Sequence, residues 1–386
     1  MSKALRLRML VITISILALG AVVANSNSPS NANGGCAGRA YVVNLGDANA
    51  SVIDTTTNAQ VGLVTGTGIN APYDVAITPD GTKAYVASYG SSSVSVIDTA
   101  TETEIATVPV GSSSPGVAIT PDGTKAYVTN NSTNNVSVID TATNTVSATI
   151  PIGADTQPYG VAITPNGAFA YVTNYQDDSV SVINTTTNTI FASAVVGDGP
   201  MGVAITPDGT KAYVTNIGSF TVSVINTTTN VAIGSPIPLG NGQPYAVAIT
   251  PNGDYAYVAG AVPAASTGSV SVIDTATDTV SATVSGGDNP RDIAITPDGA
   301  YAYSTGLSSD DVSVINTATN TVSTTIAVGN NPYGIAICPA AVVPPTTTTT
   351  TPTPTTTTTP TPTTTTTPTP ITLMPADPVV VLKLTG

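Results

Sequence analysis

Residues 116–130 read Gly-Val-Ala-Ile-Thr-Pro-Asp-Gly-Thr-Lys-Ala-Tyr-Val-Thr-Asn, and this stretch decides the fold. Two short runs rich in apolar residues, 116–120 and 125–130, stand on either side of Pro121-Asp-Gly123. Pro presets φ at the first central position of a tight turn, and Gly accepts the left-handed conformation at its end. The stretch therefore predicts a β-hairpin.

Two further strands follow this hairpin in the sequence. Residues 136–140 and 146–152 carry the same Val- and Ile-rich pattern, and Asp140-Thr-Ala-Thr-Asn-Thr145 joins them. Asp140 and Asn144 are expected to hydrogen-bond their own backbone and to fix a second turn. The unit is thus four short antiparallel strands.

The unit repeats with a period of 42 to 48 residues. A Ser-Val-Ile-Asp/Asn segment begins at Ser51, Ser95, Ser137, Ser181, Ser223, Ser271 and Ser313, and an Ala-Tyr segment places its tyrosine at Tyr41, Tyr85, Tyr127, Tyr171, Tyr213, Tyr257 and Tyr303. Four antiparallel strands per repeat form the blade of a propeller, and radial closure removes most exposed sheet edges. Residues 36–339 are therefore predicted to form an all-β, seven-bladed β-propeller.

The repeats resemble the YVTN-type β-propeller repeats of microbial surface-layer and other exported proteins. The tetrapeptide is complete at 127–130, 171–174 and 213–216, and it is varied in the other four units. The resemblance covers roughly residues 36–339. It implies the fold and export, and it implies no particular active site, because the family is defined by its repeat.

The two ends of the repeat region complement each other. The chain enters at the second strand of a unit, near Tyr41, and ends on a lone first strand, residues 333–338. One blade is therefore predicted to combine three N-terminal strands with one C-terminal strand. Aligning the repeats places Cys36 and Cys338 two positions apart in a tight turn, within the Cα separation that a disulfide tolerates. A structural Cys36–Cys338 disulfide is predicted to link the N-terminal and C-terminal parts of this blade covalently.

The flanking segments indicate an exported protein. Residues 1–24 combine a basic start with an apolar run, as a secretory signal peptide does. Residues 25–35 are interpreted as a linker, residues 340–370 as an extended Thr/Pro-rich stalk, and residues 371–386 as a tail of unknown structure. The stalk is either O-glycosylated or an unmodified stiff spacer. The mature chain is expected outside the cell or at its surface, without membrane insertion.

Composition narrows the function classes. The net charge is −14 and His is absent. Nucleic acids need clustered Lys and Arg, so they are not expected as partners. The absence of His removes the usual imidazole-based catalytic and metal sites. No catalytic residue, metal ligand or cofactor is predicted, apart from calcium as an alternative at the acidic loops Asp177-Asp178 and Asp310-Asp311.

A ring of residues just before each first strand is the candidate binding site. Its predicted ligand-binding members are Tyr73, Tyr159, Met201, Tyr245, Arg291 and Tyr333, with Pro115 in the remaining unit. The next position in each unit is small or acidic: Asp74, Gly116, Gly160, Gly202, Ala246, Asp292 and Gly334. If the first strand is innermost, these residues encircle the channel mouth, where they could hold a sugar or peptide. The alternative is that they only pack blade against blade.

Asn-x-Ser/Thr triplets give candidate N-glycosylation sites at Asn49, Asn130, Asn131, Asn135, Asn184 and Asn226. The favoured function is a scaffold, adhesion or interaction module whose partners are envelope components, other surface proteins or glycans. The alternative is a soluble extracellular binder of a sugar, peptide or metal at the channel mouth. A lactonase-like or lyase-like enzyme is not expected, because the acids recur blade after blade as turn residues.

Overall fold

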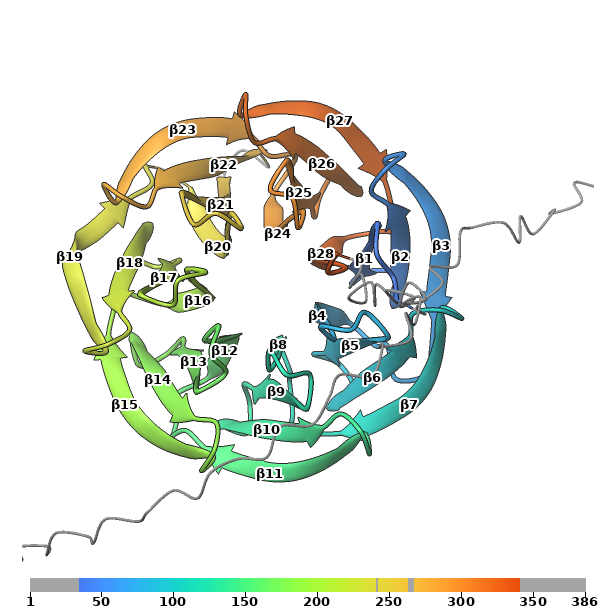
Figure 1. Cartoon of the computed structure of the whole chain (residues 1–386), viewed down its shortest axis with the longest axis horizontal. Coiled ribbons are helices and arrows are strands. Elements are labelled where there is room, and N and C mark those ends of the chain that lie inside the picture. The colour runs from blue at the N-terminus through green and yellow to red at the C-terminus, as the bar shows by residue number, and fades with distance from the viewer. Residues whose placement is uncertain (1–34, 241, 263–266, 341–386) are drawn as a thin grey trace, which may run out of the picture. The chain divides into compact units, whose positions relative to one another are not determined.

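The computed structural model describes residues 35–340 apart from 241 and 263–266. These residues lie in one compact unit, where 28 strands form seven four-stranded antiparallel sheets around a common axis (Figure 1). The predicted seven-bladed fold is confirmed. The signal peptide, most of the linker, the stalk beyond residue 340 and the tail lie outside the described residues. Within the described ranges, no helix is long and apolar enough to cross a membrane.

Each blade contributes one strand to each of four concentric layers (Figure 1). The innermost strands are β4 (Pro72–Ile77), β8 (Gly116–Ile119), β12 (Pro158–Ile163), β16 (Pro200–Ile205), β20 (Gln243–Ile249), β24 (Pro290–Ile295) and β28 (Pro332–Ile337). The second layer is β1 (Arg39–Asn44), β5 (Lys83–Ser88), β9 (Lys125–Asn130), β13 (Phe169–Asn174), β17 (Lys211–Asn216), β21 (Tyr255–Val262) and β25 (Tyr301–Gly306).

The third layer is β2 (Asn49–Asp54), β6 (Ser93–Asp98), β10 (Asn135–Asp140), β14 (Ser179–Asn184), β18 (Thr221–Asn226), β22 (Thr267–Asp274) and β26 (Asp311–Asn316). The outer layer is β3 (Ala59–Thr65), β7 (Thr103–Pro109), β11 (Thr145–Pro151), β15 (Thr189–Val195), β19 (Val231–Pro238), β23 (Thr279–Ser285) and β27 (Thr321–Ala327). The strands of the third repeat therefore begin and end within one residue of the prediction.

The hydrophobic core lies between neighbouring blades. Strand β9 is buried on both faces after its first residue, whereas the outer strand β11 is mostly exposed. The repeated tyrosine is fully buried in all seven blades. Tyr127, for example, packs with Val136 of its own blade and Val172 of the next. The repeated Tyr-Val pattern therefore supplies the buried side chains that pack one blade against the next.

In the third repeat, the turn between the third and fourth strands differs from the prediction in the hydrogen-bond partner of one residue. Asp140 Oδ1 accepts hydrogen bonds from the backbone N–H groups of Ala142 and Thr143, as expected. Asn144 instead adopts a left-handed φ of 52°, and its Oδ1 accepts a bond from the Tyr85 hydroxyl of the preceding blade at 2.7 Å. We call this inter-blade contact the tyrosine clip. The clips join Tyr85 to Asn144, Tyr127 to Asn188, Tyr171 to Asn230, Tyr213 to Asp278, Tyr257 to Asn320 and Tyr303 to Asn58.

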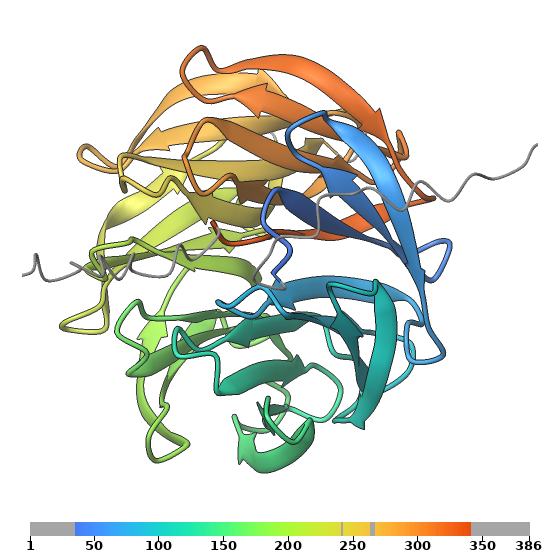
Figure 2. The same cartoon turned by 45° about the vertical axis from the view of Figure 1, so that its right-hand side comes forward.

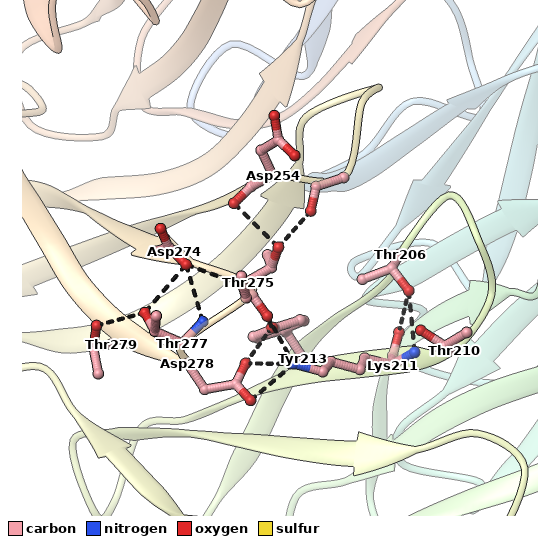
Figure 3. A network of polar contacts seen from close by, with 12 residues as sticks. Thr206, Thr210, Lys211, Tyr213, Asp254, Asp274, Thr275, Thr277, Asp278 and Thr279 are labelled. Carbon is pink, nitrogen blue, oxygen red and sulfur yellow. Dashed lines mark hydrogen bonds and ion pairs between the residues drawn. The ribbon is translucent and has the colours of Figure 1, made fainter.

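One clip uses an acid in place of asparagine (Figure 3). The Tyr213 hydroxyl donates to Asp278 Oδ1 at 2.5 Å, and Lys211 Nζ lies 2.9 Å from Asp278 Oδ2. Burial raises the pKa of Tyr213, and its bond to the Asp278 carboxylate raises that pKa further. In the seventh blade interface Glu102 occupies the same turn position and forms an ion pair with Arg39. An acid in this turn is thus accompanied by its own cation.

The ring closes through a shared blade of strand order β28-β1-β2-β3, as predicted. Strand β28 pairs antiparallel with β1, with Ala40 opposite Ile337 and Val42 opposite Ile335, and the two lie side by side in both views (Figures 1 and 2). Cys36 and Cys338 form a disulfide with Cα atoms 5.7 Å apart, and both residues are buried. The predicted bond is confirmed.

Candidate functional site at the channel mouth

The predicted ring residues line one cavity of about 130 Å³ at the start of the innermost strands. Several of these strands carry a register shift at this end, for example between Pro72 and Asp74 and between Pro290 and Ile293. Such bulges re-aim side chains. The bulges help to turn the residue after each Pro toward the axis, so all six predicted residues meet in one place.

Close approach of the innermost strands shapes this cavity. A Cβ atom on Gly334 of β28 would lie 2.6 Å from the carbonyl oxygen of Tyr73 on β4. Contacts of this kind explain why the position after the ring residue is small in five blades. Larger hollows of about 440 and 560 Å³ lie at the opposite ends of the strands, among the repeated Pro-Asp-Gly turns. There the carboxylates of Asp80 and Asp122 accept hydrogen bonds from the backbone of their own turns. The smaller cavity is therefore the better candidate for a ligand-binding site.

Tyrosines meet across the cavity. The hydroxyls of Tyr159 on β12 and Tyr333 on β28 are 2.9 Å apart and share a hydrogen bond. The Tyr73 ring packs on Tyr333 with centroids 4.2 Å apart and stacks on Tyr89 at 4.8 Å. Burial raises the pKa of Tyr159 well above its ordinary value, so this phenol stays protonated at neutral pH. The cluster therefore offers hydroxyl groups rather than phenolates.

Arg291 supplies positive charge to the same cavity. Its guanidinium carbon lies 3.9 Å from the centroid of the Tyr245 ring and 5.8 Å from that of Tyr333, which are cation–π distances. Its Nε is buried, and no described residue accepts a hydrogen bond from it. Within the part of the chain that the structure describes, Arg291 has no carboxylate within ion-pair distance.

Two carboxyl groups that the sequence analysis did not select also line the cavity. Asp74 and Asp292 are half-buried and line the cavity. Burial raises the pKa of Asp74, and the negative charge of Asp292 raises it further. Burial also raises the pKa of Asp292. Acids with raised pKa values stay protonated at pH values where an exposed aspartate is already ionised.

One backbone N–H of its own strand and one of the next blade fix the position of each acid. Asp74 accepts hydrogen bonds from the N–H groups of Val75 and Val117 at 2.7 and 2.9 Å. Asp292 accepts them from Ile293 and Ile335, both at 2.8 Å. These bonds stabilise the ionised form and oppose the effect of burial. A sequence signal for the two acids existed, because they occupy a position that is Gly or Ala in the other five blades.

The acidic-loop candidates do not line the cavity. Asp178 Oδ1 accepts a bond from Gly199 N–H, and Asp310 Oδ1 accepts one from Asn331 N–H, so these acids stabilise loops. In the described ranges, no group of three or more His, Cys, Asp or Glu is arranged to hold a metal ion. Calcium binding stays a prediction.

The candidate glycosylation sites differ in accessibility. Asn130 is buried, and its Nδ2 donates to Asn135 Oδ1 and Ser137 Oγ, so this nitrogen is not free to carry a glycan. Asn131 is partly exposed. Glycosylation at Asn49, Asn131, Asn135, Asn184 and Asn226 stays a prediction.

Comparison with known proteins finds a similarity to one described sequence family over less than half of the chain. The sequence model described as "Lactonase, 7-bladed beta-propeller" matches residues 161–336. The matched part contains Met201, Tyr245, Arg291, Asp292 and Tyr333 of the channel mouth, while Tyr73, Asp74 and Tyr159 precede it. Among curated proteins, none matches the chain. These results support a β-propeller family and do not confirm the YVTN label.

Solved structures share the fold. Hydrazine synthase of Kuenenia stuttgartiensis is 24% identical with a TM-score of 0.62, over 68% of this chain and 88% of that one. A functionally unknown protein of Desulfotomaculum acetoxidans is 22% identical with a TM-score of 0.68, over 79% and 100%. The dihydro-heme d1 dehydrogenase NirN, in complex with DHE, is 17% identical with a TM-score of 0.57, over 78% and 75%. At these identities the likeness concerns the fold alone.

The lactonase match corrects the expected function. The expectation of a scaffold or adhesion module is wrong, because the matching sequence model describes an enzyme family. That expectation rested on the acids being repeated turn residues. Asp74 and Asp292 break the repeat, and ring closure brings both to the cavity that holds Arg291.

Proposed function

We propose that the protein is a lactonase-like hydrolase that opens a small cyclic ester at the channel mouth. One observation carries the proposal: two acids with raised pKa values line the same cavity as Arg291, which has no ion-pair partner among the described residues. The similarity of residues 161–336 to seven-bladed lactonases supports it. Perturbed acids in a cavity are typical of acid–base catalysis.

The geometry supports a hydrolytic cycle with one proton donor and one acceptor. The ionised member of the Asp74/Asp292 pair takes a proton from water, and the water oxygen bonds to the ester carbonyl carbon. Arg291 and a tyrosine hydroxyl stabilise the negative charge that develops on the carbonyl oxygen. The ring C–O bond then breaks, and the leaving oxygen takes the proton of the neutral member. One water is consumed and one hydroxy acid is released.

The two acids divide the donor and acceptor roles between them. Burial raises the pKa of both, and the negative charge of Asp292 raises the pKa of Asp74 further. Ionisation of one carboxyl group therefore favours the protonated form of the other, so the site supplies both a proton donor and a proton acceptor.

The cellular setting is part of the proposal. A signal-like N-terminus and the Cys36–Cys338 disulfide support export to an oxidising compartment. The repeat pattern supports a YVTN-type propeller as the framework of the enzyme. Export would be tested by locating the processed chain in cell fractions.

A panel of five- and six-membered lactones tests the reaction. The purified protein should open at least one of them. The reaction is measured by titrating the released acid at constant pH. Asp292→Asn and Asp74→Asn should each lower kcat by about 100-fold or more, because each removes a proton-transfer group. Asp122→Asn, at a repeated turn on the opposite face, serves as the matched control and should leave kcat within about twofold. The proposal fails if no lactone opens faster than in buffer, or if the acid variants match the control.

A further inference from the structure

The cations of the propeller fall into two groups. Five Lys or Arg residues lie in the described ranges, and four of them precede the repeated tyrosine and bind polar groups of a neighbouring blade. Arg39 pairs with Glu102, Lys211 with Asp278, and the Nζ atoms of Lys83 and Lys125 donate to the carbonyl oxygens of Thr141 and Thr185. Arg291 is the exception, since it lies in the cavity without an ion-pair partner in these ranges. A buried cationic N–H without an acceptor is costly, so the site favours an incoming anion.

The neighbouring acid does not satisfy Arg291. Asp292 follows it directly, but the oxygens of Asp292 hold the N–H groups of Ile293 and Ile335. The guanidinium instead rests on the Tyr245 ring. This arrangement keeps a positive charge and its hydrogen-bond donors available next to the acid pair.

The bridging tyrosines supply a further donor. Tyr159 and Tyr333 share a single hydrogen bond between their hydroxyls, and either oxygen can be its donor. Two hydroxyls joined by one bond retain one O–H that is free to donate to a third group. A carboxylate has two acceptor oxygens, so it can bind a guanidinium and this O–H together.

Size and charge restrict the ligand. The cavity of about 130 Å³ is close to the roughly 150 Å³ of an engineered protein cavity that accepts benzene. Its walls include Tyr73, Met201 and Tyr333, which suit an apolar ring. The Asp74/Asp292 pair would repel a second negative charge. These features together select a compact monoanion.

We propose that the channel mouth binds a small monocarboxylate with a single five- or six-membered ring, its carboxylate on Arg291 and the free tyrosine hydroxyl. The inference deepens the proposed function and rests on it for its catalytic meaning, because opening a lactone generates a carboxylate in this cavity. Binding itself needs no turnover. It can therefore be measured with unreactive acids.

Titration calorimetry of the full chain with benzoate and with benzamide tests the proposal. Benzamide has nearly the same shape and no charge. Benzoate should bind with a Kd below about 1 mM, and benzamide at least about tenfold more weakly, because only benzoate pairs with the cation. Arg291→Gln should weaken benzoate binding at least about tenfold. Lys125→Gln removes a cation outside the cavity and should leave the Kd unchanged.

The outcomes separate this inference from the hydrolase proposal. Arg291-dependent benzoate binding without hydrolysis of any lactone upholds the inference and rejects the proposed reaction. Lactone hydrolysis without benzoate binding does the reverse. Equal affinities for benzoate and benzamide, or an Arg291→Gln variant that binds benzoate as the wild type does, would overturn the inference. Circular dichroism of each variant confirms that the propeller is folded.

Discussion

The tyrosine clip of Figure 3 and the channel mouth each contain an aspartate, a cationic side chain and a tyrosine, but in opposite arrangements. In the clip, Asp278 lies directly against Lys211 and the Tyr213 hydroxyl, and every charge has a partner. In the mouth, Asp292 follows Arg291 in the chain, yet its oxygens bind backbone N–H groups and the guanidinium lies on an aromatic ring. Paired charges hold blades together. Charges kept apart in a cavity remain available for a ligand.

The largest difference should appear when one tyrosine of each region is truncated. Tyr213→Ala removes a fully buried ring from a blade interface and should lower the free energy of unfolding by about 3–5 kcal/mol. Tyr245→Ala removes a half-buried cavity wall and should cost about 1 kcal/mol or less. Urea unfolding followed by circular dichroism measures both. Similar losses of stability would show that the mouth tyrosines are packing residues like those of the clips.

The pH dependence of stability should have opposite signs in the two kinds of acid. Asp74 and Asp292 have raised pKa values in the folded state, in a cavity also lined by Arg291 and the tyrosines. The folded protein therefore holds more protons than the unfolded chain above the ordinary carboxyl pKa, and stability falls as pH rises from about 5 to 9, by about 1 kcal/mol or more. Unfolding midpoints across this range measure the slope.

Matched variants test whether the two cavity acids cause this pH dependence. Combining Asp74→Asn with Asp292→Asn should remove most of the fall in the free energy of unfolding as pH rises from about 5 to 9. The turn acid Asp122 has a lowered pKa because it accepts bonds from Thr120 and Thr124, so its contribution is lost only as pH falls through that lowered pKa. Asp122→Asn should therefore leave the slope between pH 5 and 9 unchanged. An unchanged slope in the double variant would show that the pKa values of the two acids are not raised in the folded protein.

The smallest expected effect is at Asp278. Asp278→Asn restores the residue that five other clips use, so the free energy of unfolding should change by less than about 0.5 kcal/mol. Lys211→Met leaves the Asp278 carboxylate without its cation and should cost about 1 kcal/mol. Differential calorimetry resolves the two. A large loss for Asp278→Asn would mean that the clip depends on charge rather than on the hydroxyl bond.

The repeat predicted the parts of the structure that a single blade contains. Strand limits, the Asp140 turn and the blade count follow from local patterns, and the shared blade with its Cys36–Cys338 bond follows from aligning incomplete end units. The partner of Asn144 was not predicted, because the Tyr85 hydroxyl reaches it from another blade. A repeat motif describes one unit and leaves the contacts between units open.

The ring of six residues was predicted as a set because it follows the repeat. Asp74 and Asp292 were not selected, although their positions were visible as exceptions among glycines. Their chemistry depends on β24 and β4 lying on either side of β28, which only closure of the ring brings about. Electrostatic coupling between distant blades is a property of the closed ring, and no local sequence pattern contains it.

The disulfide also determines how the ring responds to mechanical force. Strands β28 and β1 are antiparallel, with Ala40 opposite Ile337, so a pull applied before Cys36 and after Cys338 would act on one end of the pair and unzip its hydrogen bonds one at a time. The covalent bond bridges these two points. A pull of this kind therefore passes through two sulfur atoms and leaves all seven blades without load. Chemical reduction would convert a ring that is insensitive to tension into one that opens from a single seam.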